Sequence, residues 1–346
     1  MSGHPVSWTH VTALTLVLMP VSWLYGLVVT LRRALYTAGL LRSEHLPAPV
    51  IVVGNITVGG TGKTPLVLWL VEHLRTAGYQ PGIVSRGYRK SGAAGPGNNE
   101  PRSVGINDDA ALCGDEPVLL ARRSRCPVWI GADRVAAARA LLAAHPDCDV
   151  IVSDDGLQHY RLARDAEIAV IDDARKFGNR LLLPAGPLRE PTSRLDSVDA
   201  VVLRVDDKPP DTSGGRPAPR FAMWLEAGPF RNLLNPDTTV DAQHFRGQRV
   251  HAAAGIGNPD HFFNTLKSLD LDFTAHPFPD HHPYTQADLA FDDCDAVVMT
   301  EKDAVKYQQF VTGDTAKYWA LEVTAKVENR LATQLIARIE RTRREF

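Results

Sequence analysis

The sequence predicts an α/β protein with a doubly wound, mostly parallel sheet, a smaller C-terminal α/β domain and an N-terminal hydrophobic membrane helix. Short runs of β-branched residues recur along the chain, and helical patterns separate several of them, which is typical of a parallel sheet covered by helices. The chain has 346 residues, 44% of them hydrophobic, enough for about two domains with real cores. A net charge of -2 argues against a protein that mainly neutralises nucleic-acid phosphates, so no nucleic-acid partner is expected.

The N-terminal segment carries no formal charge before Arg32 and Arg33. Residues 11–31 form a mostly apolar run of the length that crosses a hydrocarbon core, and Pro20 is expected to kink it. No basic region precedes the run and no small-residue cleavage site follows it, which disfavours a signal peptide. The two arginines favour a cytoplasmic location for the domain that follows. Three arrangements remain open: a membrane span, a kinked helix lodged in one leaflet, and a buried core helix. Residue types favoured at membrane interfaces lie in or near the run: Trp8, Trp23, Tyr25 and Tyr36.

A glycine-rich turn follows the first predicted strand, residues 50–53, and leads into a predicted helix at 65–76. The turn reads Gly-Asn-Ile-Thr-Val-Gly-Gly-Thr-Gly-Lys-Thr-Pro, and strand, turn, Lys-Thr and helix in this order are the context of a P-loop. In such a loop backbone N–H groups surround phosphate oxygens, Lys63 reaches the β- and γ-phosphates, and the Thr64 hydroxyl binds Mg²⁺. Thr57 stands where the P-loop pattern has its first glycine. The residues expected to bind ATP are Gly59, Gly60, Thr61, Gly62, Lys63 and Thr64.

A second phosphate-site element follows the strand predicted at 149–153. Asp154 and Asp155 come directly after it and precede Gly156, as in a Walker B-like element. A carboxylate at this position holds the Mg²⁺ ion that accompanies ATP. The alternative is a strand that simply ends in an Asp-Gly turn. The sequence does not separate the two aspartates, so both are metal-ligand candidates together with Thr64.

The remaining patterns divide the chain into four segments. Residues 206–220 turn to Pro, Gly, Asp and Ser, the composition of a loop or linker. We expect an N-terminal membrane-associated segment at 1–45, a P-loop domain at 46–206, a linker with connecting strands at 207–249, and a C-terminal α/β domain at 250–346. The other predicted strands are 82–85, 127–130, 167–171, 200–205, 250–254, 296–300 and 319–323, and the other predicted helices are 134–144, 259–269 and a basic helix at the C-terminus. The four cysteines show no metal-binding spacing and are expected to be reduced thiols: Cys113, Cys126, Cys148 and Cys294.

Eight short motifs occur together in the chain between residues 54 and 303, and the resemblance that they carry extends from the hydrophobic N-terminus to about residue 307. They are Gly-Asn with the Gly-Gly-Thr-Gly-Lys-Thr loop, Ser-Arg-Gly-Tyr at 85–88, Gly-Asp-Glu-Pro at 114–117, Asp-Arg at 133–134, Asp-Asp-Gly-Leu-Gln-His at 154–159, Leu-Pro-Ala-Gly-Pro-Leu-Arg-Glu-Pro at 183–191, Pro-Asp-His-His at 279–282 and Thr-Glu-Lys-Asp at 300–303. Each motif is weak alone, but the ordered set closely resembles the tetraacyldisaccharide 4'-kinase family of lipid A biosynthesis. Leu157 stands where that family's pattern has an aromatic residue.

The resemblance implies transfer of the ATP γ-phosphoryl group to the 4'-hydroxyl of tetraacyldisaccharide 1-phosphate, which gives lipid IVA. The implied cofactors are ATP and Mg²⁺, and the implied location is the cytoplasmic face of the bacterial inner membrane. A substrate with four acyl chains stays in the bilayer, so a retained membrane segment at the N-terminus suits such an enzyme. The expected partners are the acylated glucosamine disaccharide lipid and the inner-membrane bilayer, with no obligate protein partner.

The same resemblance implies roles for individual residues. Asp115 matches the general base and His281 its partner, although 166 positions separate them. Glu190 is a further candidate metal ligand. Five residues are implied to contact substrate or phosphate: Arg86, Tyr88, Arg134, Gln158 and Arg189.

Two other classes of protein have a similar glycine-rich loop. A P-loop switch or partitioning ATPase would hydrolyse ATP under the control of a protein partner and would form no phosphorylated lipid. A membrane-attached scaffold with a degenerate site would bind nucleotide without turnover. A lipid product heavier by one phosphate separates the kinase from both.

Overall fold

The computed structural model describes residues 8, 10–87, 100–206, 218–311 and 317–343. Within these residues one 13-stranded sheet runs through the whole molecule, in the order β11-β10-β12-β13-β8-β7-β6-β1-β5-β2-β4-β3 with β9 paired to β8. The strands are β1 Val50–Gly54, β2 Pro81–Ser85, β3 Arg102–Val104, β4 Val128–Ile130, β5 Val150–Asp154, β6 Ala166–Asp172, β7 Ala200–Arg204, β8 Arg220–Asn232, β9 Thr239–Val240, β10 Val250–Ala254, β11 Thr274–Pro277, β12 Ala296–Thr300 and β13 Tyr318–Val327.

Helices cover both faces of this sheet. The α-helices are α1 Ala13–Thr37, α2 Lys63–Thr76, α3 Ala110–Cys113, α4 Asp115–Ser124, α5 Arg134–Ala144, α6 Pro259–Ser268, α7 Glu301–Tyr307 and α8 Arg330–Arg343. Short 3-10 helices occur at Thr192–Ser197, Ala242–Phe245, Gln286–Leu289 and Gln308–Phe310. The predicted α/β class, with a mostly parallel sheet, a smaller C-terminal part and an apolar N-terminal helix, is confirmed.

The larger part, which we call the P-loop half, has β1 at its centre. β1 pairs in parallel with β5 and with β6, and all five of its residues are buried. One apolar core fills the face under α2, α4 and α8, and a second lies under α5 on the opposite face. Both faces of β1 therefore need apolar side chains, which is why the strand reads as a continuous β-branched run.

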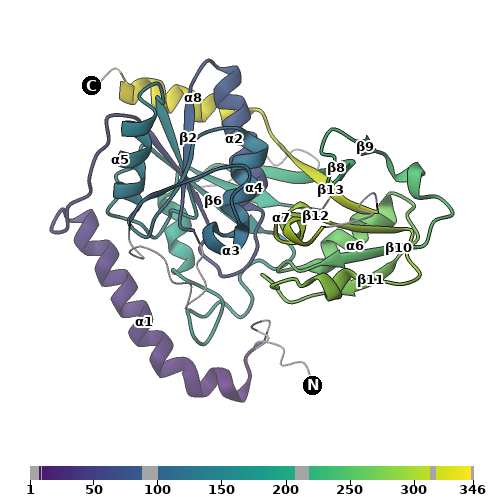
Figure 1. The fold of residues 1–346 in the computed structure, drawn as a ribbon. Coiled ribbons are helices and arrows are strands. Elements are labelled where there is room, and N and C mark those ends of the chain that lie inside the picture. The colour runs from purple at the N-terminus through teal and green to yellow at the C-terminus, as the bar shows by residue number, and fades with distance from the viewer. Residues whose placement is uncertain (1–7, 9, 88–99, 207–217, 312–316, 344–346) are drawn as a thin grey trace.

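Two long strands join this half to the smaller part, which we call the C-terminal half (Figure 1). The first residues of β8, Arg220 to Met223, pair in parallel with β7, and the strand then pairs antiparallel with β13 as far as Asn232. The range 207–249 therefore contains, within the residues described, a continuous strand that belongs to both halves.

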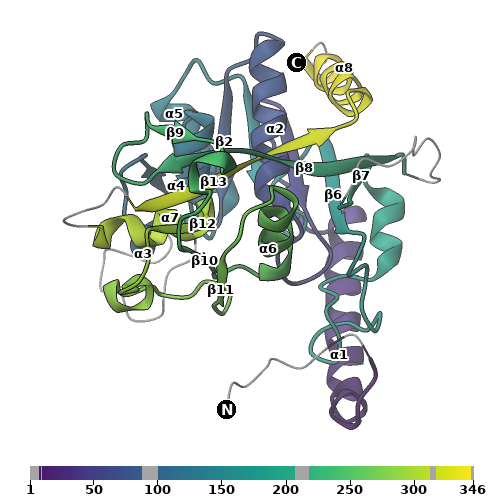
Figure 2. The same ribbon diagram turned by 90° about the vertical axis from the view of Figure 1, so that its right-hand side faces the viewer.

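The last helix does not stay with the C-terminal half. Leu331, Leu335 and Ile339 of α8 lie one helical turn apart and are buried in the core under α2 (Figure 2). The segment 250–346 is thus divided in the structure, because the apolar stripe of α8 completes the P-loop half.

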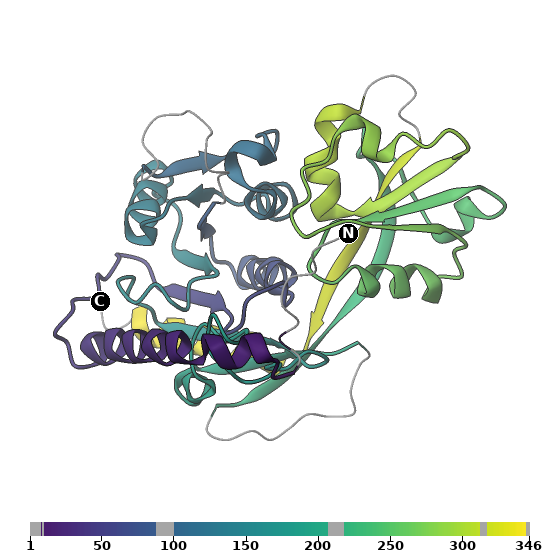
Figure 3. The same ribbon diagram turned by 90° about the horizontal axis from the view of Figure 1, so that it is seen from below.

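Helix α1 lies along the outside of the P-loop half (Figure 3). Its apolar side chains are exposed, with Trp23 at 66% and Leu27 at 65%, while Thr15, Ser22 and Gly26 are buried. The helix runs through Pro20 as one element and is long and apolar enough to cross a membrane. A core helix buries its large apolar side chains, whereas α1 exposes them and buries small or polar residues. The buried-core alternative is therefore wrong.

Candidate active site

The P-loop is a tight turn that only small residues permit at its two ends. A side chain at Gly54 would place its Cβ 2.8 Å from Leu157 Cγ, and Gly62 has a φ of 88° where α2 begins. Leu157, in the place of an aromatic residue, is fully buried and fills this contact. The first turn of α2 carries Lys63, Thr64 and backbone N–H groups that no earlier turn of the helix can bind. These groups therefore lie together beyond the end of β1.

Neighbouring loops hold the P-loop in shape. Val58 N–H donates to Pro187 O at 2.9 Å, and Asn55 Nδ2 donates to Thr61 Oγ1 at 3.1 Å. Thr57, at the position of the missing first glycine, is buried and forms a β-bridge with Leu188. A side chain is accommodated there because the residue pairs with this second strand-like segment.

Asp154 ends β5 and is completely buried. Its Oδ2 accepts a hydrogen bond from Ser85 Oγ at 3.0 Å, while its Oδ1 has no hydrogen-bond partner in the described structure. Burial, with the charges of Glu116 and Asp155, raises the pKa of Asp154 to about 7. An orphaned carboxylate oxygen in a dry site is costly unless a cation binds it, so the residues present fit Mg²⁺.

Asp155 is in a different environment although it is the next residue. Its carboxylate lies 3.5 Å from Lys63 Nζ and 3.0 Å from Arg189 Nη1. Burial would raise the pKa of Asp155, but the two cations hold it below the usual range. Asp155 therefore positions the P-loop lysine and Arg189.

Glu190 is not free to bind a metal as proposed from the sequence. The buried carboxylate accepts hydrogen bonds from Tyr160 OH and, at 3.3 Å, from Gln158 Nε2, and it lies 3.6 Å from Arg194 Nε. Gln158 Nε2 also donates to Asn55 O at 3.1 Å. Both side chains therefore hold the loops behind the P-loop together, because their polar atoms already have partners there.

Arg134 is the most buried of the predicted phosphate ligands, with 1% of its surface exposed. Its Nη1 donates to Gly131 O at 2.5 Å, whereas Nε and Nη2 have no hydrogen-bond partner in the described structure. Burial lowers the pKa of His159 to about 4, helped by the charges of Arg134 and Arg86, so His159 is neutral. Arg86 is exposed beside this group, and Tyr88 lies outside the described residues.

Asp115 and His281 meet across the two halves of the protein. Asp115 begins α4 and is buried, and its Oδ2 lies 3.0 Å from His281 Nδ1 in the loop after β11. Burial would raise the pKa of Asp115, but the hydrogen bond from His281 and the nearby Lys302 hold it below its ordinary value. The hydrogen bond to Asp115 raises the pKa of His281. The structure thus forms the predicted pair, and Asp115 is an ionised carboxylate.

A cavity of about 250 Å³ lies over the P-loop, and Asp115 and His281 line a neighbouring cavity of about 270 Å³. Its walls come from both halves, and Gly257 of the C-terminal half approaches so closely that a Cβ there would lie 3.2 Å from Gly60 N. The polar and aromatic lining includes Lys63, Thr64, Glu116, Arg204, Phe262 and Lys302. Sequence reasoning missed Glu116 and left Lys302 without a role, although both stand in the motifs at 114–117 and 300–303.

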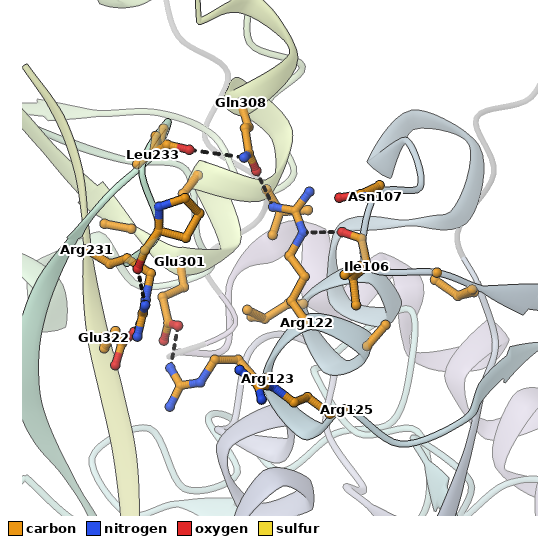
Figure 4. Close-up of a pocket in the computed structure, with 18 of the residues that line it drawn as sticks. Ile106, Asn107, Arg122, Arg123, Arg125, Arg231, Leu233, Glu301, Gln308 and Glu322 are labelled. Atoms are coloured by element: carbon orange, nitrogen blue, oxygen red, sulfur yellow. Dashed lines mark hydrogen bonds and ion pairs between the residues drawn. The ribbon is translucent and has the colours of Figure 1, made fainter. Parts of the chain in front are cut away.

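Behind this cavity the C-terminal end of α4 contacts α7 (Figure 4). Arg123 forms an ion pair with Glu301, and Arg122 Nη1 donates to Gln308 Oε1 at 2.5 Å. A second cavity of about 860 Å³ lies beside these contacts. The α4–α7 contact therefore fixes how α4, which carries Asp115, meets the C-terminal half.

Comparison with known proteins identifies the family. The model of the family described as tetraacyldisaccharide-1-P 4'-kinase matches residues 14–340. The tetraacyldisaccharide 4'-kinase of Azoarcus sp. (strain BH72) is 51% identical over 99% of this chain and 97% of its own length, and that of Aromatoleum aromaticum is 50% identical over 97% and 96%. The solved structure of the Aquifex aeolicus LpxK protein in complex with ATP superposes with a TM-score of 0.79 and 30% identity, covering 94% of this chain and 99% of that one. The chain belongs to the tetraacyldisaccharide 4'-kinase family.

Proposed function

We propose that this protein uses ATP to phosphorylate the 4'-hydroxyl of tetraacyldisaccharide 1-phosphate, which gives lipid IVA. The observation that supports the proposal is the Asp115–His281 pair, in which His281 of the C-terminal half contacts the buried Asp115 of the P-loop half, next to Glu116 in the wall of the P-loop cavity. A switch ATPase needs a positioned water and a partner-sensitive loop, whereas a carboxylate–imidazole pair suits the deprotonation of an alcohol.

The P-loop residues from Gly59 to Thr64 and the Lys63 ammonium would hold the triphosphate. Thr64 and Asp154 would hold Mg²⁺, since Asp154 has the oxygen that lacks a partner. When bound, the ion offsets negative charge on the β- and γ-phosphate oxygens. Lys63 is kept at the loop by Asp155, so the cation does not have to be ordered when ATP binds.

Asp115 would accept the proton of the 4'-hydroxyl. As the hydroxyl oxygen forms its bond to the γ-phosphorus, the bond from that phosphorus to the β–γ bridging oxygen breaks and ADP leaves. His281 donates a hydrogen bond to Asp115 and holds the carboxylate in one orientation. Arg86, Arg134 and Arg189 would bind phosphate oxygens, and the two unpaired donors of Arg134 make it the strongest of the three.

We also propose that α1 lies in one leaflet at the cytoplasmic face of the inner membrane. The helix is about 38 Å long at 1.5 Å per residue, and hydrogen bonds from Ser22, Tyr25 and Arg33 fix its middle and C-terminal part against the P-loop half, which favours a position along the membrane surface. The hydrogen bonds join Ser22 Oγ to Leu182 O, Tyr25 OH to Arg189 O, and Arg33 to Ser197, and before the helix Trp8 O accepts from Asn179 N.

Two experiments test these proposals. Purified protein, ATP, Mg²⁺ and tetraacyldisaccharide 1-phosphate in detergent micelles should give a lipid heavier by one phosphate, and ATP hydrolysis without that product would refute the kinase assignment. For the membrane arrangement, a His10→Cys variant should stay unlabelled when an impermeant thiol reagent is added outside intact spheroplasts. Labelling of that cysteine from outside would show that α1 spans the membrane.

A further inference from the structure

Lys302, in the first turn of α7, is surrounded by groups from both halves of the protein. Its Nζ lies 3.2 Å from Glu116 Oε1, 3.4 Å from Asp280 Oδ1, 3.5 Å from His281 Nε2 and 3.9 Å from Asp115 Oδ2. The side chain is only 17% exposed. These partners raise the pKa of Lys302 although burial opposes them, so the amine stays charged.

The contact with His281 determines which nitrogen of the imidazole carries the proton. An ammonium group has three donors and no acceptor, so in this contact a neutral His281 ring accepts at Nε2 from Lys302. The proton of the neutral ring is then on Nδ1, which donates to Asp115 Oδ2 at 3.0 Å. Without the ammonium, Nε2–H could face Asp280 Oδ1, 3.9 Å away, and Asp115 would lose its donor.

The other cation near the pair is already engaged. Lys306 Nζ lies 2.8 Å from Asp303 Oδ1 and 4.0 Å from Asp115 Oδ2. Asp303 is itself fixed by Gly255 N–H and Thr300 Oγ1. Lys302 is therefore the cation that balances the carboxylates around the imidazole, which are Asp115, Glu116 and Asp280.

We propose that Lys302 is a positioning residue for phosphoryl transfer, which holds His281 as the Nδ1–H tautomer and links α7 to the start of α4. The inference rests on the proposed function, since it assigns the orientation and charge of the pair that acts on the acceptor hydroxyl. Lys302 contacts Glu116 in the P-loop half and Asp280 in the C-terminal half, so its ammonium group forms these contacts only when the two halves are packed together.

The kinetic test compares Lys302→Met, Lys302→Arg and, as a control, Lys326→Met, which removes an exposed lysine from the end of β13 that lies against the P-loop half. Lys302→Met should lower kcat by roughly 10-fold to 100-fold, part of what a positioned base supplies. It should also move the acid limb of the pH–kcat profile upward by about one pH unit, because loss of a nearby cation raises the pKa of a carboxyl group. Lys302→Arg should keep the acid limb in place and recover most of the rate, since the guanidinium is also a charged donor. An unchanged acid limb in Lys302→Met, or an Arg variant as impaired as the Met variant, would overturn the proposal.

A second measurement is made on the wild-type protein, so it does not require the Lys302 variants to fold or turn over. In ¹⁵N-histidine spectra of the wild-type protein, with His281 assigned by a His281→Gln variant, the neutral ring should show a protonated Nδ1 and an unprotonated Nε2. The Nε2–H tautomer would overturn the proposal even if the enzyme is active. The wild-type protein could instead form no phosphorylated lipid while the Nδ1–H tautomer is present. In that case the proposed function fails, but the conclusion that Lys302 holds His281 in this tautomer stands.

Discussion

The ion pair between Arg123 and Glu301 offers a quantitative test of how the two halves are held together. Arg123→Met removes the cation and leaves a Glu301 side chain that is only 12% exposed. Losing one partner of a buried pair costs about 3–5 kcal/mol. Arg123 is 25% exposed, and Val323 N–H still donates to Glu301 at 3.2 Å, so we expect a smaller loss than this range, about 2–3 kcal/mol.

The assay is urea unfolding of the variant beside Lys326→Met. The control breaks an ion pair of 3.6 Å between Lys326 and Glu226, both about half exposed, and should cost less than about 0.5 kcal/mol. The double variant Arg123→Met with Glu301→Leu should regain more than half of the loss, because no uncompensated carboxylate remains and only the Val323 N–H loses a partner, at about 1 kcal/mol.

The loss should also depend on pH. Burial already raises the pKa of Glu301 although Arg123 opposes it, and the pKa must rise further without the guanidinium. A carboxyl group with a raised pKa in the folded state destabilises the protein when it is ionised, so the deficit of Arg123→Met should be full near pH 8 and shrink toward about pH 5.5 as Glu301 takes up a proton. A deficit no larger than that of Lys326→Met, or one that grows at low pH, would refute this reasoning.

Three other changes test the site and the helix. His281→Gln should lower kcat about 10-fold or more and move the acid limb of the pH–kcat profile to higher pH, because the buried carboxylate of Asp115 loses a hydrogen bond. His282→Gln changes a side chain that pairs with Asp288 and should leave kcat and the acid limb unchanged. Equal effects of the two variants would contradict the Asp115–His281 pairing. Gly26→Leu should weaken the contact of α1 with Leu182, whose Cδ1 would lie 2.6 Å from the new Cβ, and limited proteolysis near α1 should accelerate; unchanged cleavage would argue against this packing. Asp154→Asn should abolish the Mg²⁺ dependence of ATP binding measured by calorimetry, and a retained dependence would move the metal to other ligands.

The sequence predicts the central elements well because their patterns are local. The first strand carries apolar residues on both faces, and the predicted helix at 134–144 coincides with α5, Arg134–Ala144. The turn between the first strand and α2 needs glycine at fixed places, so the P-loop is also readable from residue types alone.

Contacts between distant segments are not readable in the same way. Nothing near Glu190 in the sequence shows that Tyr160 and Gln158 donate hydrogen bonds to its carboxylate oxygens. For this reason Glu190 is predicted from its motif to bind a metal. The C-terminal helix is predicted from its basic residues, but those residues do not show that α8 packs on the P-loop half. The motif at 300–303 marks Lys302 but does not show its role, because its partners come from α4 and from the loop after β11.

Asp115 is expected to take the proton of the lipid hydroxyl, beside Glu116 in the wall of the ATP cavity. The most direct measurement is the rate of phosphate transfer from ATP to tetraacyldisaccharide 1-phosphate by Asp115→Asn, with ATP affinity measured on the same preparation. The variant should bind ATP as the wild type does and transfer phosphate about 10²–10⁴-fold more slowly. An Asp115→Asn protein that transfers phosphate at close to the wild-type rate would contradict the account.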